Sequence, residues 1–302
     1  MESLTNYEAI LGDLASGKKI LIDGGTGTEI ELRGVPPIDD AWSSTGALDG
    51  PDVVREVHEA YLRAGARIVI SNTFSTSHHA LVDAGIEEKF EELNRQGVEL
   101  ARRARDEAGA AAVVAAGITH WSWTRIHPPL ELLREKAIIQ AKIMADAGAE
   151  MFILEMMTDL DRMSIILDAC RQTGLPIWVG FSCDIDGPDS ETPGTARLLG
   201  GPTLAEGVAA LDGHDVPVAL IMHTEVEDID GCLDSLDEVW NGPTGVYAHS
   251  GHFVNPNWIF NGVISPTDYA DHAQRWLDRG VQVIGGCCGI GPEHIEALQP
   301  MV

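Results

Sequence analysis

The stretch VQVIGGCCGIGPEH, residues 281–294, passes from an apolar run into glycines and places Cys287 and Cys288 side by side at the change. A β-branched apolar run that ends in glycine is typical of a buried strand followed by a loop. A disulfide between adjacent cysteines needs distorted geometry, because their Cα atoms lie too close together. Two thiols directed into one pocket suit a thiophilic metal such as zinc better. The stretch therefore predicts a final strand that leads into a metal-binding loop.

Seven similar apolar runs precede this strand and alternate with helical stretches, the pattern expected of parallel βα units. We expect strands at residues 18–25, 66–73, 111–118, 150–157, 176–183, 216–223, 244–250 and 281–288. Three of the intervening helices end in glycine just before a strand, at Gly65, Gly148 and Gly280. Eight such units predict an α/β fold, a (β/α)8 TIM barrel built as a single domain over residues 1–302. A doubly wound open sheet is the alternative, but the number and spacing of the units favour closure.

The composition is that of a globular protein, and its charge argues against two kinds of partner. Hydrophobic residues make up 44% of the chain and the net charge is −27, which argues against nucleic acid or an anionic membrane as a partner. No apolar run is long enough to span a membrane, and the N-terminus lacks the pattern of a secretory signal. Five cysteines, two of them adjacent, do not form a disulfide framework. We therefore expect a cytoplasmic protein, and a homo-oligomer is compatible with the sequence.

In a (β/α)8 barrel the functional groups stand at the carboxyl ends of the strands. One nitrogen and two sulfurs from His223, Cys287 and Cys288 would form a catalytic type of zinc site with one open position. Glu155 lies within the apolar run MFILEMM, where an unpaired acid is costly to bury, so it is a candidate ligand-binding group. The other polar groups at strand ends are Asp23, Asn72, Thr73, Cys183, His249 and His252.

Each of these residues also has a purely structural interpretation. A buried cysteine is more often a small hydrophobic residue than a ligand, and His223 would then be a polar core residue whose hydrogen bonds are satisfied. Asp23 could be a turn residue. Trp121 and Trp123, after the third strand, either enclose a methylated cation through cation–π contacts or simply cap the barrel.

Together these stretches resemble the homocysteine S-methyltransferase family, which includes betaine–homocysteine and S-methylmethionine–homocysteine methyltransferases and the homocysteine-binding module of cobalamin-dependent methionine synthase. The resemblance covers almost the whole chain. LIDGGTGTEIELRG (21–34) is similar to the family's opening strand and loop, and VREVHEAYLRAGARIVISNTF (54–74) to its second unit. AGAEMFILEMMTD (147–159) stands where the family has its acidic strand, and VIGGCCGIGPEHI (283–295) matches its metal motif.

The resemblance implies a zinc-dependent methyltransferase that moves a methyl group from a sulfonium or quaternary ammonium donor to homocysteine or a related thiol, as in methionine biosynthesis. It implies that Asp23 and Glu155 hold the amino group of homocysteine, with the backbone at Gly24 and Gly25 and the side chain of Thr73 nearby. Zinc would remove the proton of the acceptor thiol. No catalytic side chain beyond the metal site is then required, because positioning carries most of the catalysis.

The chain departs from the family at the expected metal site. The family's third ligand is a cysteine preceded by asparagine, whereas this chain has Met222 and His223, and His249 and His252 replace an amide and an acid after the seventh strand. Either His223 is the third ligand, or the metal site is rebuilt around His249 or His252. His249 and His252 would otherwise contact substrate, as would Trp121.

Two other classes of function stay open at this point. A metal-dependent hydrolase or lyase could use the same barrel mouth with a zinc-bound water as nucleophile. A non-catalytic relative could bind a thiol or a metal without chemistry.

Overall fold

The computed structural model describes residues 5–187, 190–199 and 201–302, and its main sheet contains eight parallel strands. Their order is β1-β12-β9-β8-β5-β4-β3-β2, and a parallel bridge between Ile22 and Ile68 joins β1 to β2. The sheet is therefore closed, which confirms the (β/α)8 barrel and excludes the open sheet. Each strand overlaps one predicted run: β1 (Ile20–Leu21), β2 (Ile68–Ile70), β3 (Val113–Ile118), β4 (Met151–Leu154), β5 (Ile177–Phe181), β8 (Ala219–Glu225), β9 (Thr244–His249) and β12 (Val283–Ile284).

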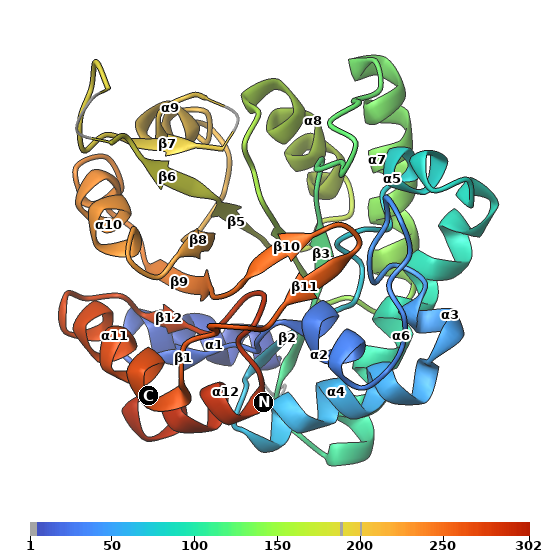
Figure 1. Ribbon diagram of the computed structural model, residues 1–302, viewed down its shortest axis with the longest axis horizontal. Helices are drawn as coiled ribbons and strands as arrows, with labels where there is room; N and C mark the ends of the chain where they lie inside the picture. The colour runs from blue at the N-terminus through green and yellow to red at the C-terminus, as the bar shows by residue number, and fades with distance from the viewer. Residues whose placement is uncertain (1–4, 188–189, 200) are drawn as a thin grey trace.

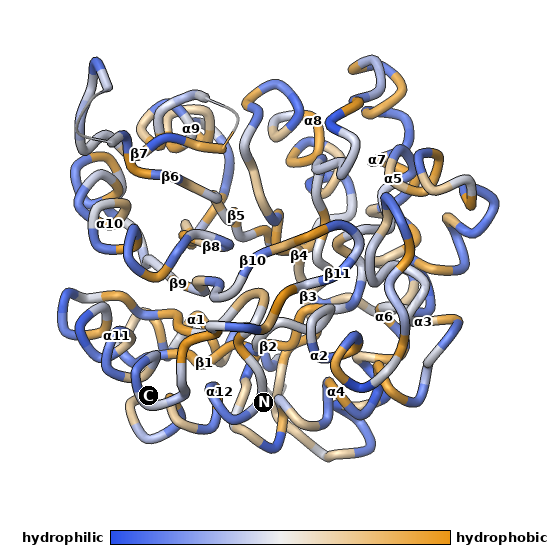
Figure 2. Tube along the Cα trace, in the orientation of Figure 1, coloured by the Kyte–Doolittle hydropathy of each residue, from blue (hydrophilic) through white to orange (hydrophobic). Residues whose placement is uncertain are grey.

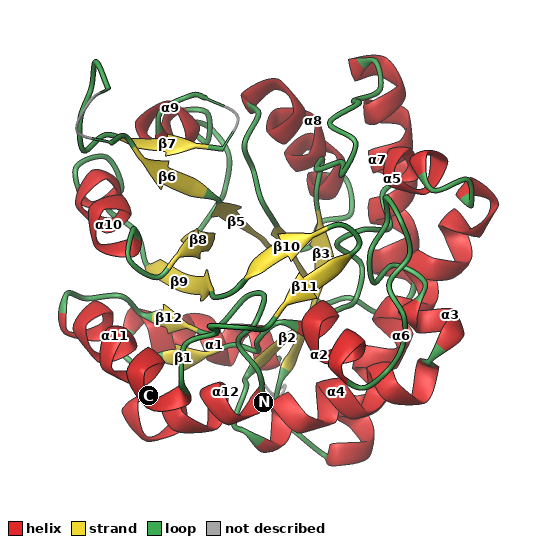
Figure 3. Ribbon diagram, viewed as in Figure 1, coloured by secondary structure: helices red, strands yellow, loops and turns green. Residues whose placement is uncertain are grey.

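Helices surround this barrel (Figures 1 and 3). They are α1 (Asn6–Ala15), α2 (Thr26–Leu32), α3 (Gly46–Asp49), α4 (Pro51–Arg63), α5 (His78–Asp83), η1 (Glu87–Lys89), α6 (Phe90–Ala108), α7 (Leu130–Asp146), α8 (Leu160–Arg171), α9 (Leu204–Ala209), α10 (Ile229–Asp237), α11 (Pro266–Asp278), α12 (Pro292–Leu298) and η2 (Gln299–Met301). In the described parts of the chain, none of the helices combines the length and the apolar composition that a membrane crossing requires.

Local sequence explains where the helices begin and end. α4 has Pro51 in its first turn, where the fixed φ of proline suits a helix and its missing N–H costs nothing. The predicted glycine stops are confirmed, because Gly65, Gly148 and Gly280 have φ values of +101°, +104° and +111°. Only glycine adopts this region without strain, so each helix can turn sharply into the next strand.

The core has two layers because successive strand residues point to opposite faces of the sheet. Ile20 and Ile22 point into the barrel, whereas Leu21 between them packs against the surrounding helices. α1 closes the amino end of the barrel, where Nε1 of Trp178 donates to the hydroxyl of Tyr7 at 3.2 Å. In Figure 2 the helices alternate between hydrophilic and hydrophobic colour, as expected of helices with one buried face. The filled amino end leaves the carboxyl end of the barrel for a ligand site.

Two antiparallel hairpins were not predicted. β6 (Cys183–Ile185) pairs with β7 (Ala196–Leu198) after β5, and β10 (His252–Val254) pairs with β11 (Asn257–Ile259) after β9. Strands of three residues are too short to show a periodic apolar pattern. The β10–β11 hairpin crosses the centre of the barrel in the view of Figure 1 and supplies part of the ligand site.

One core residue makes the fold sensitive to acid. His58 is fully buried in α4, and its ring nitrogens have no hydrogen-bond partner among the described residues. Burial lowers the pKa of His58 from 6.5 to about 4. The folded protein therefore favours the neutral ring, so the contribution of His58 to the free energy of unfolding is complete above pH 6.5 and declines as the pH falls towards 4.

We expect His58→Leu to reduce this acid sensitivity. Between pH 7.5 and pH 5, the variant should lose about 2 kcal/mol less of its free energy of unfolding than the unsubstituted protein, as measured by urea unfolding. His252→Leu is the control, because it removes an exposed histidine instead of a buried one. Equal acid sensitivity in His58→Leu and the unsubstituted protein would contradict this prediction.

Candidate metal centre

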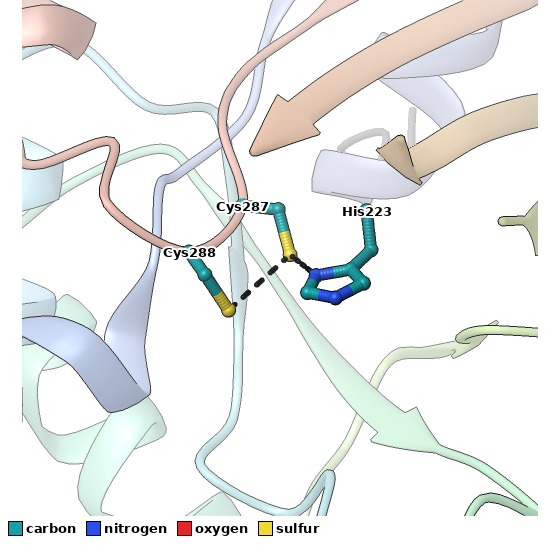
Figure 4. Close-up of side chains that lie close together, drawn as sticks. All are labelled: His223, Cys287 and Cys288. Atoms are coloured by element: carbon teal, nitrogen blue, oxygen red, sulfur yellow. Dashed lines mark hydrogen bonds between the residues drawn. The ribbon is translucent and has the colours of Figure 1, made fainter. Parts of the chain in front are cut away.

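Three potential metal ligands converge at the carboxyl end of the barrel (Figure 4). Nδ1 of His223, in β8, lies 3.5 Å from Sγ of Cys287, which lies 3.9 Å from Sγ of Cys288. A tetrahedral zinc ion with bonds of about 2.3 Å to sulfur and 2.0 Å to nitrogen separates two sulfurs by about 3.8 Å and a sulfur from a nitrogen by about 3.5 Å. The spacing of the side chains therefore fits zinc. Among the described residues, no other trio of histidine, cysteine or acidic side chains is as close.

A β-bulge directs His223 toward the cysteines. The register between β8 and β9 shifts between Met222 and Glu225, and His223 has a φ of +43°. An extra residue in one strand bends the strand and re-aims its side chain, and a non-glycine residue at positive φ is held there only by its surroundings. The bulge therefore explains how a strand residue turns its imidazole toward a loop on the neighbouring side of the barrel.

The backbone at the end of β9 and just after it holds the cysteine loop in place. Cys287 N donates to the carbonyl of Ala248 at 2.8 Å, and Ser250 N donates to the carbonyl of Cys288 at 3.0 Å. Gly289 has a φ of +79°, and a Cβ there would lie 2.0 Å from the carbonyl oxygen of Ser250. The glycine therefore allows the loop to approach β9 closely enough for these hydrogen bonds.

Two buried carboxyl groups near the cavity, those of Asp23 and Glu155, form no ion pair among the described residues. Asp23 is 1% exposed; its Oδ2 accepts a hydrogen bond from Ile70 N at 2.6 Å, but its Oδ1 has no partner among the described residues. Burial raises the pKa of Asp23 well above its usual range and that of Glu155 to about 8. The nearby hydroxyl of Tyr247 acts in the opposite direction and lowers the pKa of Glu155. Within the described residues, however, this hydroxyl makes no hydrogen bond of normal geometry. Buried acids of this kind suit a cationic ligand.

Of the residues predicted near the acceptor, the two glycines line the cavity and Thr73 does not. Gly24 and Gly25 line the cavity, and a Cβ on Gly25 would lie 2.6 Å from the carbonyl oxygen of Cys287, so this position also lets the cysteine loop approach. Thr73 lies behind the cavity wall. It is fully buried, and its hydroxyl donates to the carbonyl of Gly117 at 2.7 Å. The structure therefore does not bring Thr73 to the ligand surface as the sequence predicted.

A cavity of about 810 Å³, including its open mouth, connects the thiols, Glu155 and a set of aromatic side chains. We call the aromatic set the aromatic wall; it consists of Trp42, Phe74, Trp123, Phe253 and Trp258. The sequence indicated Trp123 but not the other four, because they lie far apart in the chain and follow no common spacing. The predicted Trp121 also lines the cavity, but the guanidinium of Arg125 lies 4.2 Å from its ring centroid and covers one face.

His249 and His252 do not join the ligand group. The ring of His249 stacks on that of His223 with 4.3 Å between centroids, and its Nε2 lies 3.1 Å from Oε1 of Glu225. His252 is exposed on β10, and neither histidine is among the residues that line the cavity. Of the two alternatives for the third ligand, the geometry supports His223.

A (β/α)8 barrel that gathers two thiols and an imidazole at its carboxyl end has a set of side chains that could hold a metal ion there. The chain belongs to the homocysteine S-methyltransferase family, because the family model matches residues 20–302. The homocysteine S-methyltransferase of Escherichia coli K12 is 29% identical over 93% of this chain and 94% of its own length. A selenocysteine Se-methyltransferase from Brassica oleracea var. italica is 25% identical over 94% of this chain and 88% of its own.

A solved structure agrees with this assignment. The metallated form of the homocysteine methyltransferase MmuM from Escherichia coli matches with a TM-score of 0.79 and 25% identity, covering 99% of this chain and 100% of MmuM. The likeness therefore extends over the whole barrel.

Proposed function

We propose that this protein transfers a methyl group from a sulfonium or quaternary ammonium compound to homocysteine or a similar amino-acid thiol, with zinc held by His223, Cys287 and Cys288. The observation that carries the proposal is one cavity lined by these three ligands, by Glu155 and by the aromatic wall, with the buried acid Asp23 next in the chain to Gly24 of its lining. Relatives named as homocysteine and selenocysteine methyltransferases support it. When bound, zinc would lower the pKa of the acceptor thiol so that its sulfur is a nucleophile at neutral pH.

Asp23 and Glu155 hold the amino group of the acceptor in this proposal. The pKa of Glu155 is about 8, so this group is largely protonated at neutral pH while the cavity holds no cation. An ammonium group would favour the ionised form and stabilise both carboxylates. The backbone at Gly24 and Gly25 borders the same cavity.

The aromatic wall binds the methyl donor in this proposal. A sulfonium or quaternary ammonium group is attracted to the negative face of an aromatic ring, and it cannot donate strong hydrogen bonds. Glu31 holds two members of the wall together, because it accepts hydrogen bonds from Nε1 of Trp42 and from the backbone N of Trp258, both at 3.2 Å. Transfer then needs no side-chain nucleophile, because the positive donor supplies its own leaving group and the cavity aligns it with the thiol.

The proposal extends to the cell compartment and to the metabolic role of the reaction. The described cysteines are all free thiols, which suits a reducing cytoplasm. Methylation of homocysteine yields methionine, so the reaction would contribute to methionine biosynthesis.

Metal analysis and a transfer assay test the proposal together. We expect about one zinc ion per chain in the purified protein and methyl transfer from at least one member of a panel of sulfonium and quaternary ammonium compounds to homocysteine. Metal without transfer from any donor would reject the methyltransferase and favour a binding protein or a hydrolase. Transfer that persists without metal would reject the zinc site.

We expect neutral amides to weaken the acceptor pocket. Asp23→Asn and Glu155→Gln each remove a charge that would face the ammonium group, so each should weaken homocysteine binding by about 1.5–3 kcal/mol in calorimetry. The exposed Asp49→Asn is the control and should bind homocysteine normally. Unchanged affinity in both pocket variants would show that these acids serve another ligand.

A further inference from the structure

The ring of His223 lacks the support that a metal-binding histidine usually has. Such a histidine normally donates its second N–H to a carboxylate, a backbone carbonyl or water, and this hydrogen bond fixes the orientation of the ring. Nδ1 of His223 faces Cys287 at 3.5 Å, whereas Nε2 makes no hydrogen bond within the described residues. The protein contacts that can hold the ring are therefore those against its face and edges, and they matter because His223 stands on a bulge at positive φ and its side chain is not completely enclosed.

The contact against the face of this ring is a stack of two imidazoles. The rings of His223 and His249 lie 4.3 Å apart between centroids with 29° between their planes. Trp258 approaches both rings edge-on, with centroid distances of 6.0 Å to His223 and 5.7 Å to His249. His249 stands on β9 and Trp258 on β11, so these two rings restrain His223 from two separate elements of the fold.

The carboxylate of Glu225 anchors the stack. Its Oε1 lies 3.1 Å from Nε2 of His249, and the register shift in β8 places Glu225 opposite His249. The same bulge therefore aims His223 and provides the anchor for its neighbour. Nδ1 of His249 is buried without a partner among the described residues. An apolar ring at position 249 could stack in the same way and would bury no unpaired nitrogen. Histidine differs from such a ring in its contact with Glu225, and this contact is a reason for histidine at the position.

We propose that Glu225 and His249 are positioning residues, which hold the imidazole of His223 toward the metal by stacking in place of the usual hydrogen bond. The proposal rests on the proposed metal site, because it assumes that His223 is a ligand. It assigns no metal contact to Glu225 or His249. Glu225 acts through His249, and His249 acts through the face of the His223 ring.

Zinc affinity tests this arrangement without an activity measurement. In competition with a chromophoric chelator, His249→Ala should bind zinc at least about tenfold more weakly than the unsubstituted protein, the usual scale for loss of an outer-shell partner. His249→Phe keeps a ring for stacking and should recover part of the loss. Glu225→Ala should also weaken binding, but should have no further effect when combined with His249→Phe. Glu227→Ala is the control, because Glu227 is an exposed acid two residues further along the chain.

The outcomes separate this inference from the metal site itself. Loss of zinc in His223→Ala, with normal affinity in His249→Ala and Glu225→Ala, would overturn the positioning role and leave the metal site intact. Normal zinc affinity in His223→Ala would overturn both. The absorption bands of the cobalt-substituted protein give a second measure, because a tilted His223 ring should shift them in His249→Ala but not in Glu227→Ala. Unchanged bands in a His249→Ala protein that has weakened affinity would also overturn the positioning role.

Discussion

Cys287→Ala and Cys288→Ala are each expected to leave the purified protein almost without zinc and to reduce methyl transfer on the order of a thousandfold. Loss of an outer-shell partner alone costs 10- to 100-fold in metal affinity or activity, so loss of a direct thiolate should cost more. The second thiol cannot compensate, because His223 and one cysteine leave only two protein ligands, whereas catalytic zinc sites use three. Elemental analysis and the transfer assay measure the two effects.

Cys170→Ala is the matched control for these variants. Cys170 is also a buried free cysteine, but it lies in α8 and packs in the layer between helices and strands. Its loss should cost some stability and leave the zinc content unchanged. Full zinc content in the double variant Cys287→Ala, Cys288→Ala would refute the assignment of the vicinal pair as ligands.

The barrel could be predicted from sequence because its determinants are local. Each strand is a short apolar run, and glycines such as Gly65 and Gly280 mark the sharp turns that lead into the strands. Closure follows from the number of units, since eight βα units commonly form a barrel. The β10–β11 hairpin could not be predicted, because its pairing depends on the approach of β11 to α2 and the cavity rather than on its own three-residue strands.

The sequence alone predicted only those site residues whose type is unusual for their position in the chain. Cys287 and Cys288 are adjacent in sequence, and Glu155 is an acid within an apolar run, so each drew attention by itself. The anchor at Glu225 depends on a register shift of one strand against its neighbour, and the sequence of β8 shows no sign of that shift. Thr73 has a suitable side chain for a ligand, but its hydroxyl is used inside the wall.

The histidine at position 223 changes the charge of the proposed metal site. Two thiolates and a neutral imidazole balance the charge of a zinc ion, whereas the three thiolates typical of the family would leave one net negative charge. Burial and the neighbouring His249 hold the pKa of His223 well below its usual range, so the metal-free protein already presents the neutral ring that coordination requires. The less negative site should acidify an incoming thiol more strongly and leave its sulfur less nucleophilic.

His223→Ala and His223→Cys should therefore separate ligation from reactivity. His223→Ala removes a ligand, and we expect zinc affinity to fall on the order of a hundredfold or more. His223→Cys should keep the metal, because it supplies a third thiolate and the longer zinc–sulfur bond of about 2.3 Å, against about 2.0 Å for nitrogen, makes up part of the shorter side chain. Both variants keep a non-glycine residue at the strained position, so the difference between them reports on the ligand atom rather than on the bulge.

His249→Ala completes the comparison by testing the alternative ligand on β9. If His249→Ala lost zinc completely while His223→Ala kept it, the third ligand would be His249 on β9. The stack of the two rings would then have to open when the metal binds. We expect the opposite order, because Nε2 of His249 already faces Glu225 and its ring lies beside His223 rather than between His223 and the cysteines.

The pH dependence of methyl transfer in His223→Cys measures the effect of the charge of the metal site directly. A more negative site should raise the pKa of the bound acceptor thiol, so the pH profile should move to higher pH than in the unsubstituted protein.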